Sequence, residues 1–413
     1  MSREYDIAVV GGGLAGASLA CALADTGLSV ALIEAVAFDT PADDNLRART
    51  TALAWGTRAM FESLDLWGAM ADSAAAIERL HVSQAGYFGR VTVAADEYDL
   101  PALGYVVPNT AMIAALRDRL AAQDHVELIA PARFETRFES LAYDDQGQPV
   151  LTLDEGRAVR ARLLIGADGQ NSAVRAALGI GAQVDDYGQS AIITVVTPER
   201  AHDGCAYERF LPGGPLALLP RTPDTCAAVW AVPTDEATAL CAASETAFTQ
   251  ALNAAFGHRL GALTLAGPRG AYPLARVLAD RGVAPRAALI GNAGHALHPA
   301  AAQGFNLSIR DALGLADIIR EHQSLKGEAF DPGDADMLAA WAEARQPDQH
   351  RVANFTDGIV RLFSNHLPGL GHARGAGLFG LSLAPGLRAD MARRSMGLAL
   401  LDDLPRVDKG IKR

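Results

Sequence analysis

Three glycines near the amino terminus have the spacing of a phosphate-binding turn. Gly11, Gly13 and Gly16 form G-x-G-x-x-G after the β-type run "YDIAVV", and they lead into residues 14–27, a run with helical spacing that ends at Gly27. In such a turn the first glycine permits a sharp bend, the second lets the backbone approach a pyrophosphate, and the third lets helix and strand pack closely. The pattern predicts a dinucleotide site, with a ligand-free glycine-rich turn as the alternative.

The residues around this turn suit the same site. Leu14 and Ala15 open the helix, whose free N–H groups and positive end attract phosphate oxygens. A second strand, "SVALIEA", carries Glu34 about 20 residues further on, where an acid can bind a ribose hydroxyl. Strand, turn, helix and strand make one βαβ unit. The alternative for Glu34 is a solvated acid at the end of a strand.

Two later segments repeat the change from strand to glycine. "RLLIGADG" covers residues 162–169, and "RAALIGNAG" covers residues 286–294. The second leads into "HALHPAAAQGFNLSIRDA", which opens a helix near Gly304 with almost no bulky side chain at its start. We therefore expect something large to lie against this bare backbone.

The middle and the end of the chain have other patterns. Four β-type runs separated by Pro, Gly and Asp indicate an inserted antiparallel sheet: residues 191–197, 205–211, 214–220 and 225–233. Residues 244–257 have helical spacing, and the end is helical from residue 334 with a break at 367–377. We predict an α/β fold with three parts: a discontinuous Rossmann-like domain (1–180 and 270–335, with some strands of the substrate domain near 80–110), a β-sheet substrate domain (181–269), and a C-terminal helical region (336–413).

Composition excludes several classes of protein. Half of the 413 residues are hydrophobic and 20% are charged, as in a globular protein with a large core. The net charge of −12 argues against nucleic-acid binding. The four cysteines have no metal-ligand spacing, so we expect reduced thiols and no metal site.

Charge and hydropathy also bear on location. The first strand leaves no room for a signal peptide and no apolar run is long enough to span a bilayer, so we expect a cytoplasmic protein. Residues 351–413 hold ten Arg/Lys and five Asp/Glu, a local charge of +5 that leaves −17 on the rest. The basic, apolar segment 378–400 could therefore rest on an anionic membrane surface. A solvated helix or a core-packed helix is the alternative.

The three glycine-bearing segments together resemble the FAD-dependent aromatic hydroxylases of the p-hydroxybenzoate hydroxylase type. The motifs are the first turn with Glu34, "GADGQNSAVR" at 166–175, and "GNAGHALHPAAAQGFNLSIRD" at 291–311. Within that group, "RTTALAWGT", "LGYVVPN", "YERFLPGGPLALLP" and "TDGIVRLFSN" are similar to the ubiquinone-biosynthesis hydroxylases, the last two most to the 2-octaprenyl-6-methoxyphenol 4-hydroxylases. Two positions depart from the wider family's pattern: Asn292 replaces Asp, and Ala302 replaces Gly.

This resemblance implies a GR2-type FAD-binding domain and a set of FAD contacts. The implied contacts are Gly11, Gly13, Leu14, Ala15, Gly16, Glu34, Arg49, Asp168, Gly169, Gly291, Asn292, Ala293, Pro299, Gln303, Gly304, Phe305 and Asn306. Alternatives stay open for three residues near the site. Gln303 could only cap a helix, Arg49 could pair with the acidic residues 43–44, and Arg175 could only stabilise a helical turn.

The resemblance also implies a reaction. FAD takes electrons from NAD(P)H, reduced FAD activates O2, and the phenol ring of a polyprenylated substrate is hydroxylated in ubiquinone biosynthesis. The candidates for the wall of the substrate cavity are Tyr207, Phe210, Leu216, Leu218 and Pro220, with core packing of alternate residues as the other interpretation. For His295 and His298 a structural role is favoured over proton movement, and no catalytic residue is assigned.

Partners and alternative functions complete the prediction. The implied protein could lie peripherally on the inner membrane and join a ubiquinone-biosynthesis complex. One alternative is a flavin hydroxylase that acts at another ring position or on another phenol. An alternative of a different class is a FAD-bound scaffold without turnover.

Overall fold

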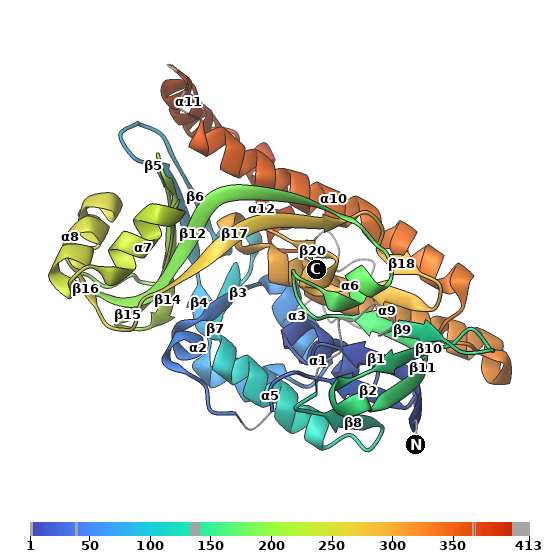
Figure 1. Cartoon of the computed structure of the whole chain (residues 1–413). Helices are drawn as coiled ribbons and strands as arrows, with labels where there is room; N and C mark the ends of the chain where they lie inside the picture. Colours follow the sequence, from blue (N-terminus) through green and yellow to red (C-terminus); the bar gives the residue numbers. More distant parts are fainter. Residues whose placement is uncertain (1–2, 38–39, 133–140, 366, 368, 399–413) are drawn as a thin grey trace.

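The computed structural model describes residues 3–37, 40–132, 141–365, 367 and 369–398. Its strands form an eight-stranded sheet, a nine-stranded sheet and a three-stranded sheet (Figure 1). The α/β fold class is confirmed. The predicted division into domains stays a prediction, although pairing extends the nine-stranded sheet beyond residue 269 through the strand Gly270–Ala279.

A parallel sheet forms the centre of the nucleotide-binding part. Its order is β19-β11-β1-β2-β8, with β1 (Arg3–Val10), β2 (Val30–Ile33), β8 (Val126–Ile129), β11 (Ala158–Gly166) and β19 (Ala287–Leu289). All four residues of β2 are buried, as expected for a parallel strand covered on both faces. Antiparallel strands extend this sheet: β9 (Leu141–Tyr143), β10 (Pro149–Thr152) and β18 (Val283–Ala284).

Helices cover one face of this sheet. There α1 (Leu14–Ala22) packs against both α5 (Asn109–Ala121) and α9 (Gly304–Lys326). Helix α1 ends at Ala22 and a turn follows, so the helix end predicted at Gly27 was wrong; Gly27 has φ +70° and ends the turn instead. The predicted helix start near Gly304 is confirmed.

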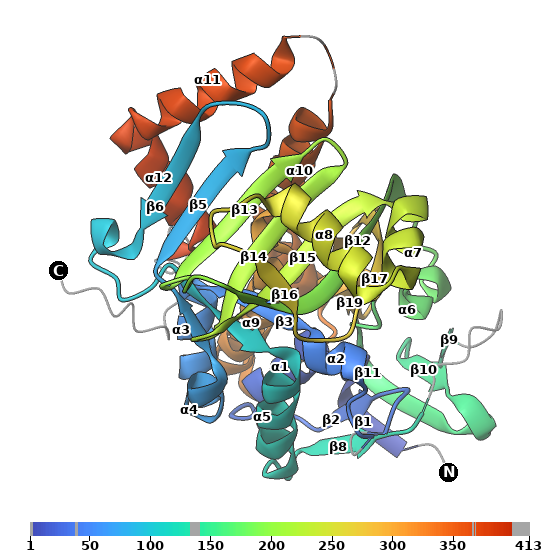
Figure 2. The same cartoon turned by 90° about the vertical axis from the view of Figure 1, so that its left-hand side faces the viewer.

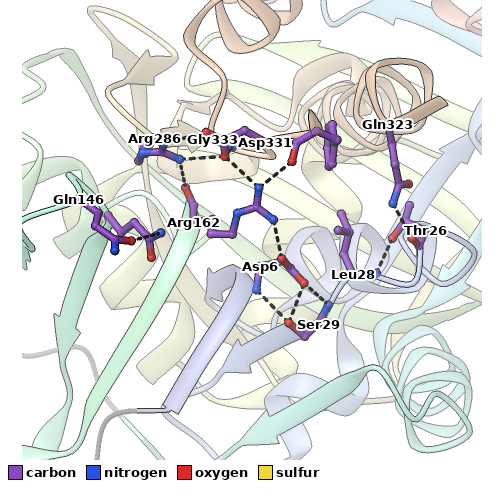
Figure 3. Close-up of polar contacts among 12 residues, drawn as sticks. Asp6, Thr26, Leu28, Ser29, Gln146, Arg162, Arg286, Gln323, Asp331 and Gly333 are labelled. Atoms are coloured by element: carbon purple, nitrogen blue, oxygen red, sulfur yellow. Dashed lines mark hydrogen bonds and ion pairs between the residues drawn. The ribbon is translucent and has the colours of Figure 1, made fainter. Parts of the chain in front are cut away.

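An ion-pair cluster stabilises the parallel sheet at a place distant from the glycine turns (Figure 3). Arg162 of β11 donates to Asp6 of β1 at 3.0 Å, and Arg286 makes a two-bonded pair with Asp331 at 2.9 and 2.7 Å. Arg286 also donates to the carbonyl oxygen of Arg162. This cluster joins β1 and β11 to the segment that precedes the C-terminal helices.

The nine-stranded sheet has the order β20-β17-β12-β15-β14-β13-β5-β6, with β16 paired to β12. Its strands are β5 (Arg79–Gln84), β6 (Arg90–Ala94), β12 (Ala182–Pro198), β13 (Cys205–Leu211), β14 (Gly214–Thr222), β15 (Thr225–Pro233), β16 (Leu263–Leu265), β17 (Gly270–Ala279) and β20 (His295–Ala296). Helices α7 (Thr234–Ala242) and α8 (Glu245–Phe256) cover its outer face (Figure 1). The four β-type runs predicted between residues 191 and 233 all form strands of this sheet.

A small sheet lies between the two larger ones. It consists of β3 (Thr50–Ala54), β4 (Ala75–Ile77) and β7 (Gly104–Pro108), and the short helices near it are α2 (Asp44–Ala48), α3 (Trp55–Ser63) and α4 (Trp67–Met70). Strand β14 contacts both β4 and β7. The inner face of the nine-stranded sheet, opposite α7 and α8, is therefore directed toward the nucleotide-binding part.

Three helices end the described chain: α10 (Ala335–Ser364), α11 (Leu370–Ser382) and α12 (Pro385–Ser395). The break predicted at 367–377 was too long, because α11 begins at Leu370 despite its glycines. Helix α11 lies along the hairpin of β5 and β6 (Figure 2). The last two residues of the segment 378–400 lie outside the described residues.

Candidate functional site

Three glycine-bearing turns meet at one edge of the parallel sheet. Strands β1, β11 and β19 are neighbours and run in parallel, so the turns after Val10, Gly166 and Leu289 lie side by side. An added Cβ at Gly11 would lie 2.4 Å from the Ala167 carbonyl oxygen, and one at Gly291 would lie 3.0 Å from the Ala15 Cβ. The predicted segments are thus packed against one another.

The first turn leaves room for a ligand at one glycine only. At Gly16 an added Cβ would lie 2.0 Å from the Gly11 carbonyl oxygen, whereas at Gly13 it would meet nothing within 4 Å. The fold itself requires Gly11 and Gly16 but not Gly13. Gly13 is also the N-cap of α1 and makes no side-chain cap, so the first N–H groups of this helix remain available for phosphate oxygens. These residues are suited to a dinucleotide pyrophosphate.

Glu34 braces this turn from the next strand. Its carboxylate accepts hydrogen bonds from the Gly12 N–H at 2.7 Å and from the Val36 N–H at 3.0 Å. The side chain is therefore tied to the backbone at the mouth of α1, rather than being a purely solvated acid. Its bond to a ribose hydroxyl stays a prediction.

The second turn is organised by Asp168. Its carboxylate accepts from the Ser172 hydroxyl and from the N–H groups of Ala173 and Val174, which caps α6 (Ala173–Ala177). Gly169 beside it has φ +89°, a conformation that favours glycine. Asp168 thus has a structural task within its own turn, and its predicted contact with FAD remains a prediction.

Arg175 joins the second turn to the third. Its guanidinium donates to the Ala293 carbonyl oxygen at 2.8 Å and to the Gln170 carbonyl oxygen at 2.9 Å. The alternative of a residue that only stabilises a helical turn is therefore wrong. In the third turn Gly291 has φ +61°, and the Asn292 side chain between buried Gly291 and Ala293 is exposed, where it can reach a ligand.

The loop Pro299–Gln303 leads to the bare start of α9. Gln303 is the N-cap of α9 but its side chain makes no cap; its amide donates to the carbonyl oxygens of Ala301 and Ser395. The alternative in which Gln303 only caps the helix is therefore wrong. The first N–H groups of α9, at Gly304 and Phe305, therefore receive no hydrogen bond from an N-cap side chain. This positive helix end can stabilise negative charge on a ligand.

The side chains of Phe305 and Asn306 contact other parts of the protein. The Phe305 ring packs against Phe61 with 6.3 Å between centroids. Asn306 is 1% exposed, accepts from the Ala54 N–H, and donates to the carbonyl oxygens of Ala52 and Ala302. The Phe305 ring thus packs α9 on α3, and the Asn306 side chain ties α9 to β3 and to Ala302. The FAD contacts that the resemblance implies for both residues stay a prediction.

Arg49 makes a contact that the sequence did not indicate. Its guanidinium lies 4.7 Å from the centre of the Tyr272 ring of β17, and Asp43 instead caps α2 through the Leu46 N–H. The predicted alternative of an ion pair with residues 43–44 has no support among the described residues. Arg49 therefore links β3 to the inner face of the nine-stranded sheet.

Most of the residues predicted to form the wall of the substrate cavity point to the opposite face of the sheet. Leu216 and Leu218 are fully buried in the core beneath α7 and α8, and Tyr207, the cross-strand partner of Leu218, packs its ring against Phe256 of α8. Buried Pro220 pairs with Cys226 of the same core. These side chains point to the outer face because residues two apart along a strand share a face. Phe210 has the opposite parity, and its ring stacks on Phe363 of α10 at 3.8 Å.

The inner face carries a row of cross-strand partners that we call the inner row: Ile193, Val229, Ala217, Glu208 and Val82. All five keep part of their surface accessible, whereas their neighbours toward α8, such as Leu216 and Trp230, are buried. Glu208 is the one charged member, and sequence reasoning missed it. The available signal was a lone acid at an inward position of the strand pair 205–220.

The two histidines of the third segment are both buried and hydrogen-bonded. The His298 Nδ1 accepts from the Ala300 N–H, its Nε2 contacts the Gln189 Oε1 at 3.3 Å, and burial lowers the pKa of His298 to about 4. His295 Nε2 contacts the Asp311 carboxylate at 2.5 Å. Both residues thus have the structural role that was favoured. Across the described part of the chain, no group of His, Cys, Asp and Glu side chains could hold a metal ion.

Comparisons with known proteins agree with this geometry. The model of a family described as FAD binding domain matches residues 4–356. A ubiquinone hydroxylase, UbiL, of Rhodospirillum rubrum is 36% identical over 99% of this chain and 94% of its own. The 3-demethoxyubiquinol 3-hydroxylase of Escherichia coli is 32% identical over 96% of this chain and all of its own. Among solved structures, that of Pseudomonas aeruginosa PqsL in complex with 2-aminobenzoylacetate has a TM-score of 0.74 at 22% identity, over 92% of this chain and all of that one, which shows a shared fold.

Proposed function

This chain belongs to the FAD binding domain family of flavin-dependent hydroxylases, and from that premise we propose that it hydroxylates a polyprenylated phenol in ubiquinone biosynthesis. The proposed reaction is 4-hydroxylation of a 2-polyprenyl-6-methoxyphenol, with NAD(P)H as the reductant and O2 as the oxygen source. The observation that carries this proposal is the packing of α1 against α9, two helices whose N-caps make no side-chain hydrogen bond, beside the glycine turns of the parallel sheet.

The residues of the site suit FAD, which supplies electron transfer from NAD(P)H and the activation of O2 when it is bound. The N–H groups of α1 and the open side of Gly13 would hold the pyrophosphate. Asn292 would meet the ribityl chain, and the loop Pro299–Gln303 would lie along the ring edge with the start of α9 directed at it. These groups bind and orient the cofactor and favour negative charge on its ring.

The inner face of the nine-stranded sheet would hold the substrate ring. Ile193, Val229, Ala217 and Leu219 present small or aliphatic side chains there, and each is partly accessible. A phenol ring placed against this face is shielded from water, which favours oxygen transfer over loss of the activated oxygen. Phe210 stays a candidate for this wall.

The membrane contact belongs to the same proposal. Large exposed apolar side chains gather on the β5–β6 turn and on α11 and α12: Tyr87, Phe88, Phe379, Leu383 and Leu387. An added Cβ at Gly89 would lie 2.0 Å from the Gly375 carbonyl oxygen, so the hairpin and α11 meet backbone to backbone (Figure 2). We call this surface the apolar edge. Leu378 and Leu381 of the segment 378–400 instead pack on the core, as in the predicted alternative of a core-packed helix.

A basic pocket adjoins the apolar edge. It has a volume of about 600 Å³, and Arg90, Arg209, Arg259 and Arg388 line it together with Phe379. Such a combination suits an anionic bilayer surface. No helix in the described ranges is long and apolar enough to span a membrane.

The proposed reaction is tested on the purified, FAD-loaded protein. We expect 2-methoxyphenols to accelerate NADH or NADPH oxidation and to yield the 4-hydroxylated ring. Deletion of the gene should lead to accumulation of the 6-methoxyphenol precursor. Accumulation of a precursor that lacks a different ring oxygen would assign another position. Flavin reduction that no phenol accelerates would favour the FAD-bound scaffold and overturn the proposed activity.

A further inference from the structure

Glu208 lies in β13 and its side chain is directed to the inner face. Its neighbours Tyr207 and Arg209 point to the outer face, where the Tyr207 ring meets Phe256 and the Arg209 guanidinium donates to the Ala255 carbonyl oxygen of α8. The cross-strand partners of Glu208 are Ala217 of β14 and Val82 of β5. The carboxyl group therefore stands in an apolar row on the side of the sheet that faces the nucleotide-binding part.

No partner neutralises this carboxyl group among the described residues. Burial alone raises the pKa of Glu208 to about 7, and no charged group contributes to that shift. The inner-face positions of β14 and β5, which are Ala217, Leu219, Leu80 and Val82, carry no titratable group. Helix α10 also packs against β13, and its Asp357 pairs with Arg361 and accepts from Tyr187.

The Glu208 carboxyl group is deeply buried, but its side chain keeps some solvent-accessible surface. The group lies far enough inside the protein for burial to shift its titration strongly, and its surface is still partly accessible. The carboxyl group is thus largely removed from bulk water, and it lies outside the apolar core beneath α8. An unpaired acid at such a place costs stability, and an acid whose pKa is strongly shifted is a candidate for a functional role.

Two sets of contacts connect β13 with the loop Pro299–Gln303, where the ring of FAD is expected. Helix α10 contacts the loop Ala300–Ala302 and also β13 and β14. His298, next to Pro299, contacts Gln189, whose amide donates at 2.8 Å to the Gly213 carbonyl oxygen in the turn between β13 and β14. The hairpin that carries Glu208 is therefore held against the segment that precedes α9.

We propose that Glu208 is the catalytic base that accepts the phenol proton of the substrate, an inference that rests on the proposed function. The phenol O–H bond breaks, the proton passes to the Glu208 carboxylate, and the electron pair remains on the phenol oxygen. The electron-richer ring then takes one oxygen atom of O2, whose activation consumes the two electrons of NAD(P)H, and the other oxygen leaves as water. The ring carbon loses its own proton, and the proton on Glu208 returns to the phenol oxygen.

Ligand binding to the oxidised FAD-bound protein tests this role without turnover. The dissociation constant of 2-methoxyphenol should fall about tenfold between pH 6 and pH 8, since the ionised carboxylate accepts a stronger hydrogen bond. 1,2-Dimethoxybenzene has no O–H group, so it should not bind more tightly at pH 8 than at pH 6. In Glu208→Gln both constants should become independent of pH, while Glu236→Gln, an exposed site on α7, should match the wild type.

Turnover supplies the second measurement. The wild-type kcat/KM for 2-methoxyphenol should fall on the acid side of about pH 7. Glu208→Gln should lower kcat/KM about 100-fold at pH 8 and remove that acid limb. Glu208→Asp, which retains an acid, should keep a pH dependence and serves if the Gln variant does not bind FAD. Unchanged pH profiles of binding and turnover in the Gln variant would overturn the role. A wild type that oxidises no phenol would overturn the proposed function instead, and the binding slopes would still test Glu208.

Discussion

Ala301 and Ala302 occupy backbone conformations that glycine adopts more easily. Their φ angles are +67° and +49°, in the left-handed region, immediately before Gln303. For a residue with a Cβ this region costs roughly 1–2 kcal/mol. The family that the sequence resembles usually has Gly at position 302. Ala302 keeps a left-handed backbone conformation there, so the change from Gly to Ala adds strain.

Replacement of this alanine should therefore relieve strain. We expect Ala302→Gly to raise the free energy of unfolding by up to about 1 kcal/mol, because relief of the left-handed conformation exceeds the added freedom of the unfolded chain. Ala300→Gly is the matched control, since buried Ala300 lacks a positive φ and should lose about 1 kcal/mol. Urea unfolding of the FAD-free proteins measures both. Equal destabilisation by both variants would contradict the assignment of strain to residue 302.

At the scale of single elements, the first turn separates a fold requirement from a ligand requirement. An added methyl group at Gly16 collides with the Gly11 backbone, whereas one at Gly13 projects into open space. We expect Gly16→Ala to lower the thermal midpoint of the FAD-free protein, and Gly13→Ala to leave it nearly unchanged. Gly13→Ala should weaken FAD binding at least tenfold, which flavin fluorescence titration measures. If Gly13→Ala binds FAD with wild-type affinity, the assignment of the pyrophosphate to this turn is contradicted.

Helices α9 and α10 are joined by buried ion pairs. Asp311 of α9 is 0% exposed and accepts from His295, Arg345 and Gln349. Burial by itself would raise the pKa of Asp311, but the charges of His295 and Arg345 outweigh it and lower the pKa to about 2. Because a depressed pKa favours the folded state, this pairing stabilises the protein above about pH 4 and is lost as pH falls toward 2.

Removal of this charge should be costly. We expect Asp311→Asn to lower the free energy of unfolding at pH 7 by about 3–5 kcal/mol, because Arg345 remains buried without its full partner. Exposed Asp336→Asn on α10 should change it by less than about 0.5 kcal/mol. Below about pH 4 the difference between wild type and Asp311→Asn should shrink. A constant difference down to pH 2 would show that Asp311 does not titrate as described.

At the scale of the whole molecule, the apolar edge and the basic pocket lie together. The elements that carry them, α11, α12 and the β5–β6 hairpin, form one end of the molecule (Figure 2). Phe88, Leu383 and Leu387 are 60, 68 and 59% exposed. The remainder of the acidic protein is repelled by an anionic surface, so this end should dock in one orientation.

Vesicle flotation tests this orientation. We expect the protein to bind vesicles that contain anionic lipid, and less so as salt is raised. The double variant Leu383→Asp/Leu387→Asp should reduce binding at least tenfold. Leu325→Asp, at a side chain that is 75% exposed near the end of α9, should leave binding unchanged. Equal loss in both variants would assign no special role to the apolar edge.

Local spacing in the sequence determined several elements of both large sheets. The turn at Gly11–Gly16, the strands between residues 191 and 233 and the start of α9 follow from glycine spacing and from periods of 2 and 3.6, which act over a few residues. The residues expected at the FAD site stay a prediction, which rests on the same glycine spacing and on the family resemblance, because backbone contacts with a cofactor require small residues in sequence order.

Only the tertiary structure decided which sheet face meets the cofactor-binding part. Strand alternation separates Leu218 from Glu208, but the location of α8 on one face and of β4 and β7 on the other determines which residue faces the core and which faces the site. The contacts of Arg175 with Ala293 and of Asp311 with Arg345 likewise join residues 118 and 34 positions apart. Such pairings depend on how the elements pack, and no short-range pattern in the sequence encodes them.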